Sequence, residues 1–110
     1  MVGHSGDYEA TVKAAESIDE CLRRITEAIL EVNGECLITA AHGNAEQMID
    51  DNGQPMTQHT TGPVNLIYVT QRSQVSMQEG RLSDIAPTLL TMMGLEQPAE
   101  MSGVPLVRYL

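Results

Sequence analysis

Aromatic residues are scarce in this sequence, which has three tyrosines and no phenylalanine or tryptophan among 110 residues. Proteins that bind single-stranded nucleic acids commonly stack bases on aromatic side chains, so the composition disfavours that function. Basic residues are also few, with six against fifteen acidic ones and a formal net charge of -9. This charge argues against nucleic acid and anionic membranes as partners, and any bound anion would need a cation to help hold it.

Long apolar runs and a targeting signal are also missing. No apolar run reaches the roughly 18 residues that cross a bilayer, and no basic segment followed by an apolar run opens the chain. We therefore expect a soluble, cytoplasmic protein with no membrane partner. The two cysteines, Cys21 and Cys36, form no Cys-X-X-Cys pattern. We expect both to be buried small side chains without redox or metal chemistry.

Hydrophobic residues make up 42% of the chain, enough for the core of one domain. Apolar residues recur at spacings of three and four from Tyr8 to Val32, which predicts a long amphipathic helix. Polar residues at 5–7 are suited to begin it, and Asn33-Gly34 is suited to end it. A second, shorter helix is predicted from a cap at Ser83-Asp84 to Gly94.

Two apolar, β-branched runs, 36–40 and 64–70, are predicted to be strands. Between them lies a long irregular segment, 41–62, rich in Gly, Asn, Thr and His. The polar residues 71–80 and the tail 95–110, which contains prolines and glycines, are expected to be irregular. The order of helix, strand, loop, strand and helix indicates an α/β fold, in which ligands bind at the carboxyl ends of strands. Two strands are too few for a complete sheet.

The only histidines are His4, His42 and His59, and each lies in a loop-like segment rich in Gly or Thr. A lone histidine in such a loop is most often a surface or capping residue. Three histidines in one loop system make metal binding an equally strong interpretation. Their spacing alone does not choose between the two.

Four ordered motifs resemble the cofactor-independent phosphoglycerate mutases of the alkaline phosphatase superfamily. They are Met-Val-Gly-His-Ser-Gly at 1–6, Leu-Ile-Thr-Ala-Ala-His-Gly-Asn-Ala-Glu-Gln-Met at 37–48, His-Thr-Thr at 59–61 and Leu-Ser-Asp-Ile-Ala-Pro-Thr at 82–88. The segment 94–103 is similar to that family's closing segment. The resemblance covers the chain from Met1 to about Leu106.

This resemblance implies that residues 1–110 are the C-terminal part of a metal-binding phosphatase domain, a partial alkaline-phosphatase-like three-layer sandwich with helices on a small, incomplete sheet. It implies an isomerase that interconverts 3-phosphoglycerate and 2-phosphoglycerate in glycolysis through a phosphoserine, with two Mn²⁺ ions. One ion would activate the serine and the other would hold phosphate oxygens. By resemblance, His4 and His59 belong to one metal site and His42 to the other.

The departures from the family pattern bear on activity. An aspartate ligand that lies shortly upstream of Met1 in the family, the nucleophilic serine segment and the inserted transferase domain are all absent from these 110 residues. Ala41 stands where the family has a second aspartate ligand. The carboxylates of Glu46, Asp50 and Asp51 are expected to be a solvated loop face rather than substitute ligands. We therefore expect no catalytic residue in the chain, weak or no Mn²⁺ binding, and no activity from the chain alone.

Two alternatives remain open. The chain could be a non-catalytic module that self-associates as a homodimer, because its helix stripe and strand edges would otherwise be uncovered. It could also be a segment of a related metal-dependent phosphatase or phosphopentomutase. The motifs at 37–48 and 82–88 favour the mutase over this second alternative.

Overall fold

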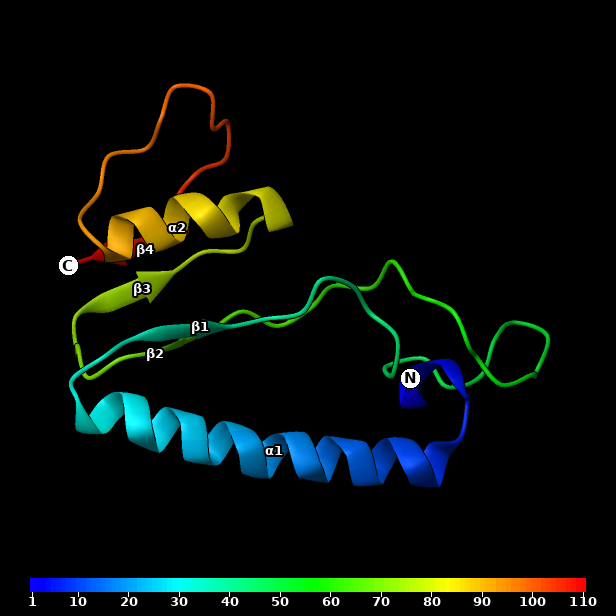
Figure 1. Ribbon diagram of the computed structural model, residues 1–110. Coiled ribbons are helices and arrows are strands. Elements are labelled where there is room, and N and C mark those ends of the chain that lie inside the picture. The colour runs from blue at the N-terminus through cyan, green and yellow to red at the C-terminus, as the bar shows by residue number, and fades with distance from the viewer. The chain divides into compact units, whose positions relative to one another are not determined.

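The computed structural model describes residues 1–110, and the chain divides into two compact units, Met1–Val69 and Thr70–Leu110. Helices and strands are mixed along the chain, which confirms the α/β prediction (Figure 1). The strands form two separate pairs, each antiparallel, so the sheet is small and incomplete, as expected. Neither helix has the length and apolarity that crossing a membrane requires.

The first unit contains the predicted long helix, α1 (Tyr8–Glu31). The helix begins after Asp7, whose carboxylate accepts a hydrogen bond from the backbone amide of Ala10 at 3.1 Å. This bond satisfies one of the amide donors that the first turn leaves unpaired. Beyond the other end, Asn33 has a φ of 57°, a left-handed conformation that asparagine and glycine tolerate and that stops a helix.

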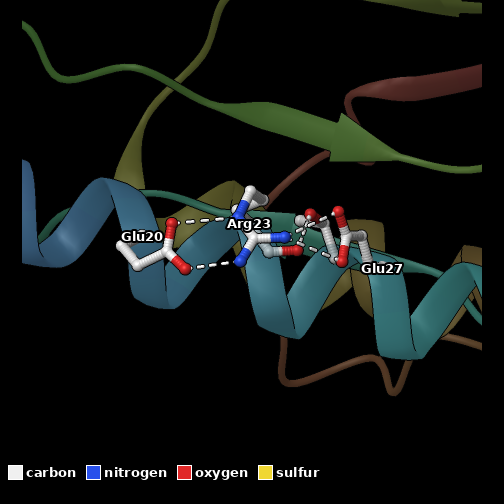
Figure 2. A network of polar contacts seen from close by, with 4 residues as sticks. Glu20, Arg23 and Glu27 are labelled. Carbon is white, nitrogen blue, oxygen red and sulfur yellow. Dashed lines mark hydrogen bonds and ion pairs between the residues drawn. The ribbon is translucent and has the colours of Figure 1, made fainter.

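The polar face of α1 carries an ion-pair network centred on Arg23 (Figure 2). Its Nε donates to Glu20 at 2.9 Å, and its Nη1 donates to Glu27 at 3.0 Å. The three residues are spaced by three and four positions, so they share one face of the helix. This face is solvated, as one face of an amphipathic helix is expected to be.

The opposite face of α1 is only partly covered. No side chain of the helix is fully buried, and Ile18 and Ile25 are 59% and 53% exposed. Cys21 is exposed as well, so its predicted burial is wrong; Cys36 is half-buried. Cys21 is turned by about 100° from its neighbour Leu22, which is half-buried. A two-stranded sheet offers little surface against a 24-residue helix.

Both predicted strands of this unit are present but shorter, as β1 (Cys36–Ile38) and β2 (Ile67–Val69). They pair antiparallel with Leu37 opposite Tyr68. One residue beyond β1, the Thr39 hydroxyl donates to the carbonyl of Asn65 at 2.7 Å and continues the contact between the two segments. The loop between the strands is irregular, as predicted, with isolated bridges at Gly43–Thr60 and Ile49–Pro55.

The second unit contains the predicted short helix, α2 (Ile85–Met92), which follows a 3₁₀ turn, η2 (Leu82–Asp84). It also contains an antiparallel pair that the sequence did not predict, β3 (Val75–Met77) and β4 (Val107–Tyr109). Residues 71–80 and 95–110 were expected to be irregular, and this was wrong for both strands. Each strand is three residues long, too short for alternation to be recognised.

The buried side chains of this unit gather around α2. The buried hydrophobic residues are Leu106 and Val107, and Asp84 and Thr88 are buried polar residues. The carboxylate of Asp84 accepts hydrogen bonds from the amides of Arg81 and Val104, both at 2.8 Å. These bonds tie the tail to the start of α2, so the tail is held by buried polar groups as well as by apolar packing.

Candidate metal centre

The three histidines lie close together in the first unit, although 38 and 17 positions separate them along the sequence. His4 ends a short 3₁₀ turn, η1 (Val2–His4), His42 lies four residues after β1, and His59 lies in the loop before β2. The rings of His42 and His59 are stacked, with centroids 3.5 Å apart and planes inclined by 14°. The ring of His4 lies 5.2 Å from that of His59.

Hydrogen bonds fix the tautomers of two of these rings. The Nδ1 of His4 donates to the carbonyl of Thr57 at 2.9 Å, and the Nδ1 of His42 donates to the carbonyl of Gly43 at 3.0 Å. Carbonyl oxygens only accept, so Nδ1 carries the hydrogen and Nε2 of the neutral ring keeps its lone pair. Histidines that bind metals are commonly oriented in this way.

The surroundings of His59 favour the neutral form of its imidazole. The loss of water around the ring lowers the pKa of His59 below the ordinary histidine value, and the charges that His42 and His4 can carry lower it further. Only a neutral imidazole offers a lone pair to a metal ion. The lowered pKa therefore favours the form of His59 that can bind a metal.

The donor set fits a metal ion only in part. Three imidazoles are suitable nitrogen donors, but no three or more His, Cys, Asp or Glu side chains are placed so that they could hold one ion together. Ala41, next to His42, is exposed and ends in a methyl group. The imidazoles can therefore contribute to metal sites, but with the other residues of this chain they do not complete one.

Glu46 is the residue of this loop whose role the sequence did not predict. Its carboxylate accepts hydrogen bonds from the amide of Asn44 at 2.6 Å and from the hydroxyl of Thr60. The Thr60 bond, with smaller contributions from backbone amides and the nearby His42, lowers the pKa of Glu46. Glu46 is therefore a bonded part of the loop and not only a solvated carboxylate.

The other two carboxylates of the loop differ from Glu46. Asp50 accepts hydrogen bonds from the amides of Asn52 and Gln54, both at 2.9 Å, and so closes a turn within the loop. Asp51 is exposed. The signal that could have distinguished Glu46 is the presence of Gly43 and Gly62, which leave room for its carboxylate.

Comparisons with known proteins give the chain a family. Residues 1–97 match the metalloenzyme superfamily. The chain is 64% identical over 107 residues to the 2,3-bisphosphoglycerate-independent phosphoglycerate mutase of Hahella chejuensis, and 56% identical over 108 residues to that of Aeromonas salmonicida. Each comparison covers 97% of this chain and 21% of the relative, so the chain spans about a fifth of the length of these relatives.

A solved structure gives the same result at the level of the fold. It is titled "Crystal structures of Leishmania mexicana phosphoglycerate mutase at low cobalt concentration". The likeness has a TM-score of 0.84 at 30% identity, and covers 99% of this chain and 23% of that one. The chain therefore belongs to the metalloenzyme superfamily, and within it the sequence matches a segment of the 2,3-bisphosphoglycerate-independent phosphoglycerate mutases.

Proposed function

We propose that this chain is the C-terminal segment of the metal-binding phosphatase domain of a manganese-dependent, cytoplasmic phosphoglycerate mutase of glycolysis. The enzyme would interconvert 3-phosphoglycerate and 2-phosphoglycerate through a phosphoserine. The observation that carries the proposal is the convergence of His4, His42 and His59, two of which have Nε2 available. The identity to the two bacterial mutases supports the substrate class.

In this proposal His4 and His59 contribute to one metal site and His42 contributes to the other. Two Mn²⁺ ions, when bound, would supply the positive charge that activates the serine hydroxyl and neutralises phosphate oxygens. The chain's own part is to hold three imidazoles in place. The matched relatives are about five times as long, which leaves room for the carboxylate ligands, the serine and the substrate-binding residues on other segments.

The 110 residues alone are proposed to be inactive. A route that depends on a covalent nucleophile loses almost all of its rate without that nucleophile. A coupled assay of 2-phosphoglycerate formation tests this directly. Turnover that scales with the concentration of this chain and survives purification would contradict the proposal.

A chimeric enzyme tests the proposed role of the histidines. This chain would replace the segment that it matches in the Hahella chejuensis mutase. We expect low activity with Mn²⁺ and a rise of about 100-fold or more in the Ala41→Asp chimera, because the restored carboxylate would help to hold a metal ion, and the charge stabilisation that such an ion supplies is worth several kcal/mol. His42→Ala in the Ala41→Asp chimera should abolish the gain.

A second variant of the same chimera is the control for Ala41→Asp. Ala45→Asp places a new carboxylate on an exposed position of the same loop and should leave activity low. A folded Ala41→Asp chimera that shows no mutase activity would contradict the proposal.

A second candidate function rests on the exposed apolar stripe of α1. A non-catalytic, self-associating module would bury Ile18 and Ile25 against another copy. The two functions are compatible, since a homodimer of this chain need not involve the histidines. A third candidate is a related phosphatase or phosphopentomutase. It is less well supported, because the two bacterial relatives described above are phosphoglycerate mutases.

A further inference from the structure

The carboxylate of Glu46 lies in a space that two glycines leave open. A Cβ atom added to Gly62 would lie 2.8 Å from Glu46 Oε1, and one added to Gly43 would collide with the same oxygen. In that space Glu46 accepts one hydrogen bond at each oxygen, from the Asn44 amide and from the Thr60 hydroxyl. The carboxylate therefore bridges the two sides of the loop.

The side chain of Asn44 makes a second connection. Its Nδ2 donates to the carbonyl of Gln58 at 3.0 Å. Its Oδ1 lies against Gly3, where an added Cβ would collide with it. The amide of Asn44 thus lies between the segment that carries His4 and the segment that carries His59.

The residues that the Asn44 and Glu46 side chains bridge are sequence neighbours of the histidines. Gly3 precedes His4, and Gln58 and Thr60 flank His59. Gly43 follows His42, and its carbonyl accepts from both the Thr60 amide, at 2.9 Å, and the His42 ring, at 3.0 Å. Hydrogen bonds therefore join the His42 segment to the His59 segment, and the His4 segment joins them through the close approach of Asn44 to Gly3 and the bond of the His4 ring to Thr57.

We propose that Asn44 and Glu46 are positioning residues, together called the loop clamp, which hold His4, His42 and His59 together without binding the metal themselves. Both Glu46 oxygens already accept hydrogen bonds from protein donors, and the Asn44 side chain is used between two backbone segments. The inference rests on the proposed function only in taking the three histidines as metal ligands. The hydrogen bonds of the clamp are independent of that role.

The direct test is a nuclear magnetic resonance measurement on the metal-free 110-residue chain. The stacked rings of His42 and His59 should give cross-relaxation between their ring protons and ring-current shifts of both. We expect both signals to disappear in Thr60→Val, which keeps the shape of threonine but removes the hydroxyl that Glu46 binds. Thr60→Ser keeps the hydroxyl and should retain both signals. Thr61→Val is the matched control on an exposed neighbour.

Glu46→Gln tests the other end of the bond. Glutamine offers one acceptor oxygen where the carboxylate offers two, so one of the two donors loses its partner. The stacking of the two histidine rings should weaken. Asp51→Asn makes the same charge change on an exposed position of the loop and should have no effect. Far-UV circular dichroism of α1 shows whether each variant is folded. If Glu46→Gln is unfolded, the comparison of Thr60→Val with Thr60→Ser still tests the bond between Thr60 and Glu46.

Calorimetry with zinc shows whether Glu46 positions the histidines or binds the metal itself. It also tests separately whether the three histidines bind a metal, as the proposed function requires. Loss of a group that orients metal-binding histidines costs roughly 10- to 100-fold in metal affinity, so Thr60→Val should weaken zinc binding by at least about tenfold. Weaker zinc binding in Glu46→Gln with the ring stacking intact would make Glu46 a ligand and overturn the clamp. Disrupted ring stacking with unchanged zinc binding would support the clamp and overturn the histidine metal site. If neither the stacking nor the zinc affinity changes, the clamp is overturned.

Discussion

Individual buried polar residues contribute to the stability of the second unit, and Thr88 is one example. It is fully buried, its hydroxyl donates to the carbonyl of Asp84 at 2.7 Å, and the same oxygen accepts from the amide of Leu106 at 2.8 Å. Thr88→Val keeps the shape but leaves the Leu106 amide unpaired. We expect a loss of about 1–3 kcal/mol in the free energy of unfolding. Urea denaturation followed by circular dichroism measures it.

The conservative variant Thr88→Ser is the control for this prediction, because it keeps the hydroxyl and removes one methyl group. It should cost less than Thr88→Val. Hydrogen exchange of the Leu106 amide should accelerate in Thr88→Val and not in Thr88→Ser. Equal stability of the valine variant and the parent chain would show that the bond to Leu106 contributes nothing.

Asp84 makes the stability of the same unit depend on pH. Its hydrogen bonds from the Val104 and Arg81 amides lower the pKa of Asp84 in the folded chain below the ordinary value of 3.8. A group with a depressed folded pKa stabilises the fold at pH values above its unfolded pKa, and the contribution is lost as pH falls through the folded pKa. We therefore expect thermal stability to fall below about pH 4.

Asp84→Asn should reduce that dependence, since asparagine does not titrate, whereas Glu46, whose pKa is also lowered, keeps its part. The melting temperature of the variant should be lower than that of the parent at pH 7, and the two should converge as the pH falls below about 4. Asp51→Asn, at an exposed position, should keep the parent's pH profile. A parent whose melting temperature does not change as the pH is lowered from neutral to well below the ordinary aspartate pKa would contradict the argument.

At the residue scale, the sequence indicated which residues lie together better than it indicated their hydrogen-bond partners. The convergence of His4, His42 and His59 was expected from their loop contexts and from the resemblance, and the structure brings all three together. Their role as ligands stays a prediction. The bonds of Glu46 to Asn44 and Thr60 were not predicted, because a carboxylate in a polar loop looks alike in sequence whether it is solvated or bonded; only Gly43 and Gly62, which leave room for the side chain, set Glu46 apart.

At the scale of elements, local signals were sufficient where the element is long. The 24 residues of α1 contain several repeats of the apolar spacing. The helix begins directly after a capping aspartate, and shortly beyond its end lies an asparagine in the left-handed conformation. The pairing of β3 with β4 gave no such signal. Its two strands are three residues each and lie about 30 positions apart, so only the folded chain brings them together.

The ion-pair network of α1 should contribute little to stability. Arg23 and its two glutamate partners are all more than half exposed, and water and salt screen such pairs. Arg23→Gln should lower the melting temperature by about 2 °C or less at low salt. The difference in melting temperature between the variant and the parent should vanish in about 1 M sodium chloride, where the electrostatic screening length is about 3 Å.

Arg24→Gln is the matched control, because Arg24 carries the same charge on the same helix and pairs with neither Glu20 nor Glu27. Its melting temperature should respond to salt as that of the parent does. A large loss of stability in Arg23→Gln that persists at high salt would mean that Arg23 acts through packing of its side chain rather than through its charge.

At the scale of the whole molecule, apolar surface is left without cover. No hydrophobic side chain of the first unit is fully buried, although hydrophobic residues make up 42% of the sequence. The expectation that two predicted strands are too few for a complete sheet agrees with the two-stranded sheet of this unit. Composition predicts how much apolar surface a chain has, but not how much of it the available elements can cover.

That uncovered surface predicts self-association of the 110-residue chain. Ile18, Ile25 and Val32 are 59%, 53% and 78% exposed and lie seven positions apart, so they follow one stripe of α1 and its end. Burying an isoleucine is worth about 1.5–3 kcal/mol, and repulsion between chains of charge -9 is screened within about 10 Å at about 0.1 M salt. We expect a homodimer in sedimentation across a concentration series. Ile25→Glu should weaken it by at least about tenfold, whereas Ile49→Glu, on an equally exposed loop residue, should not. A folded monomer at high micromolar concentration would contradict this prediction.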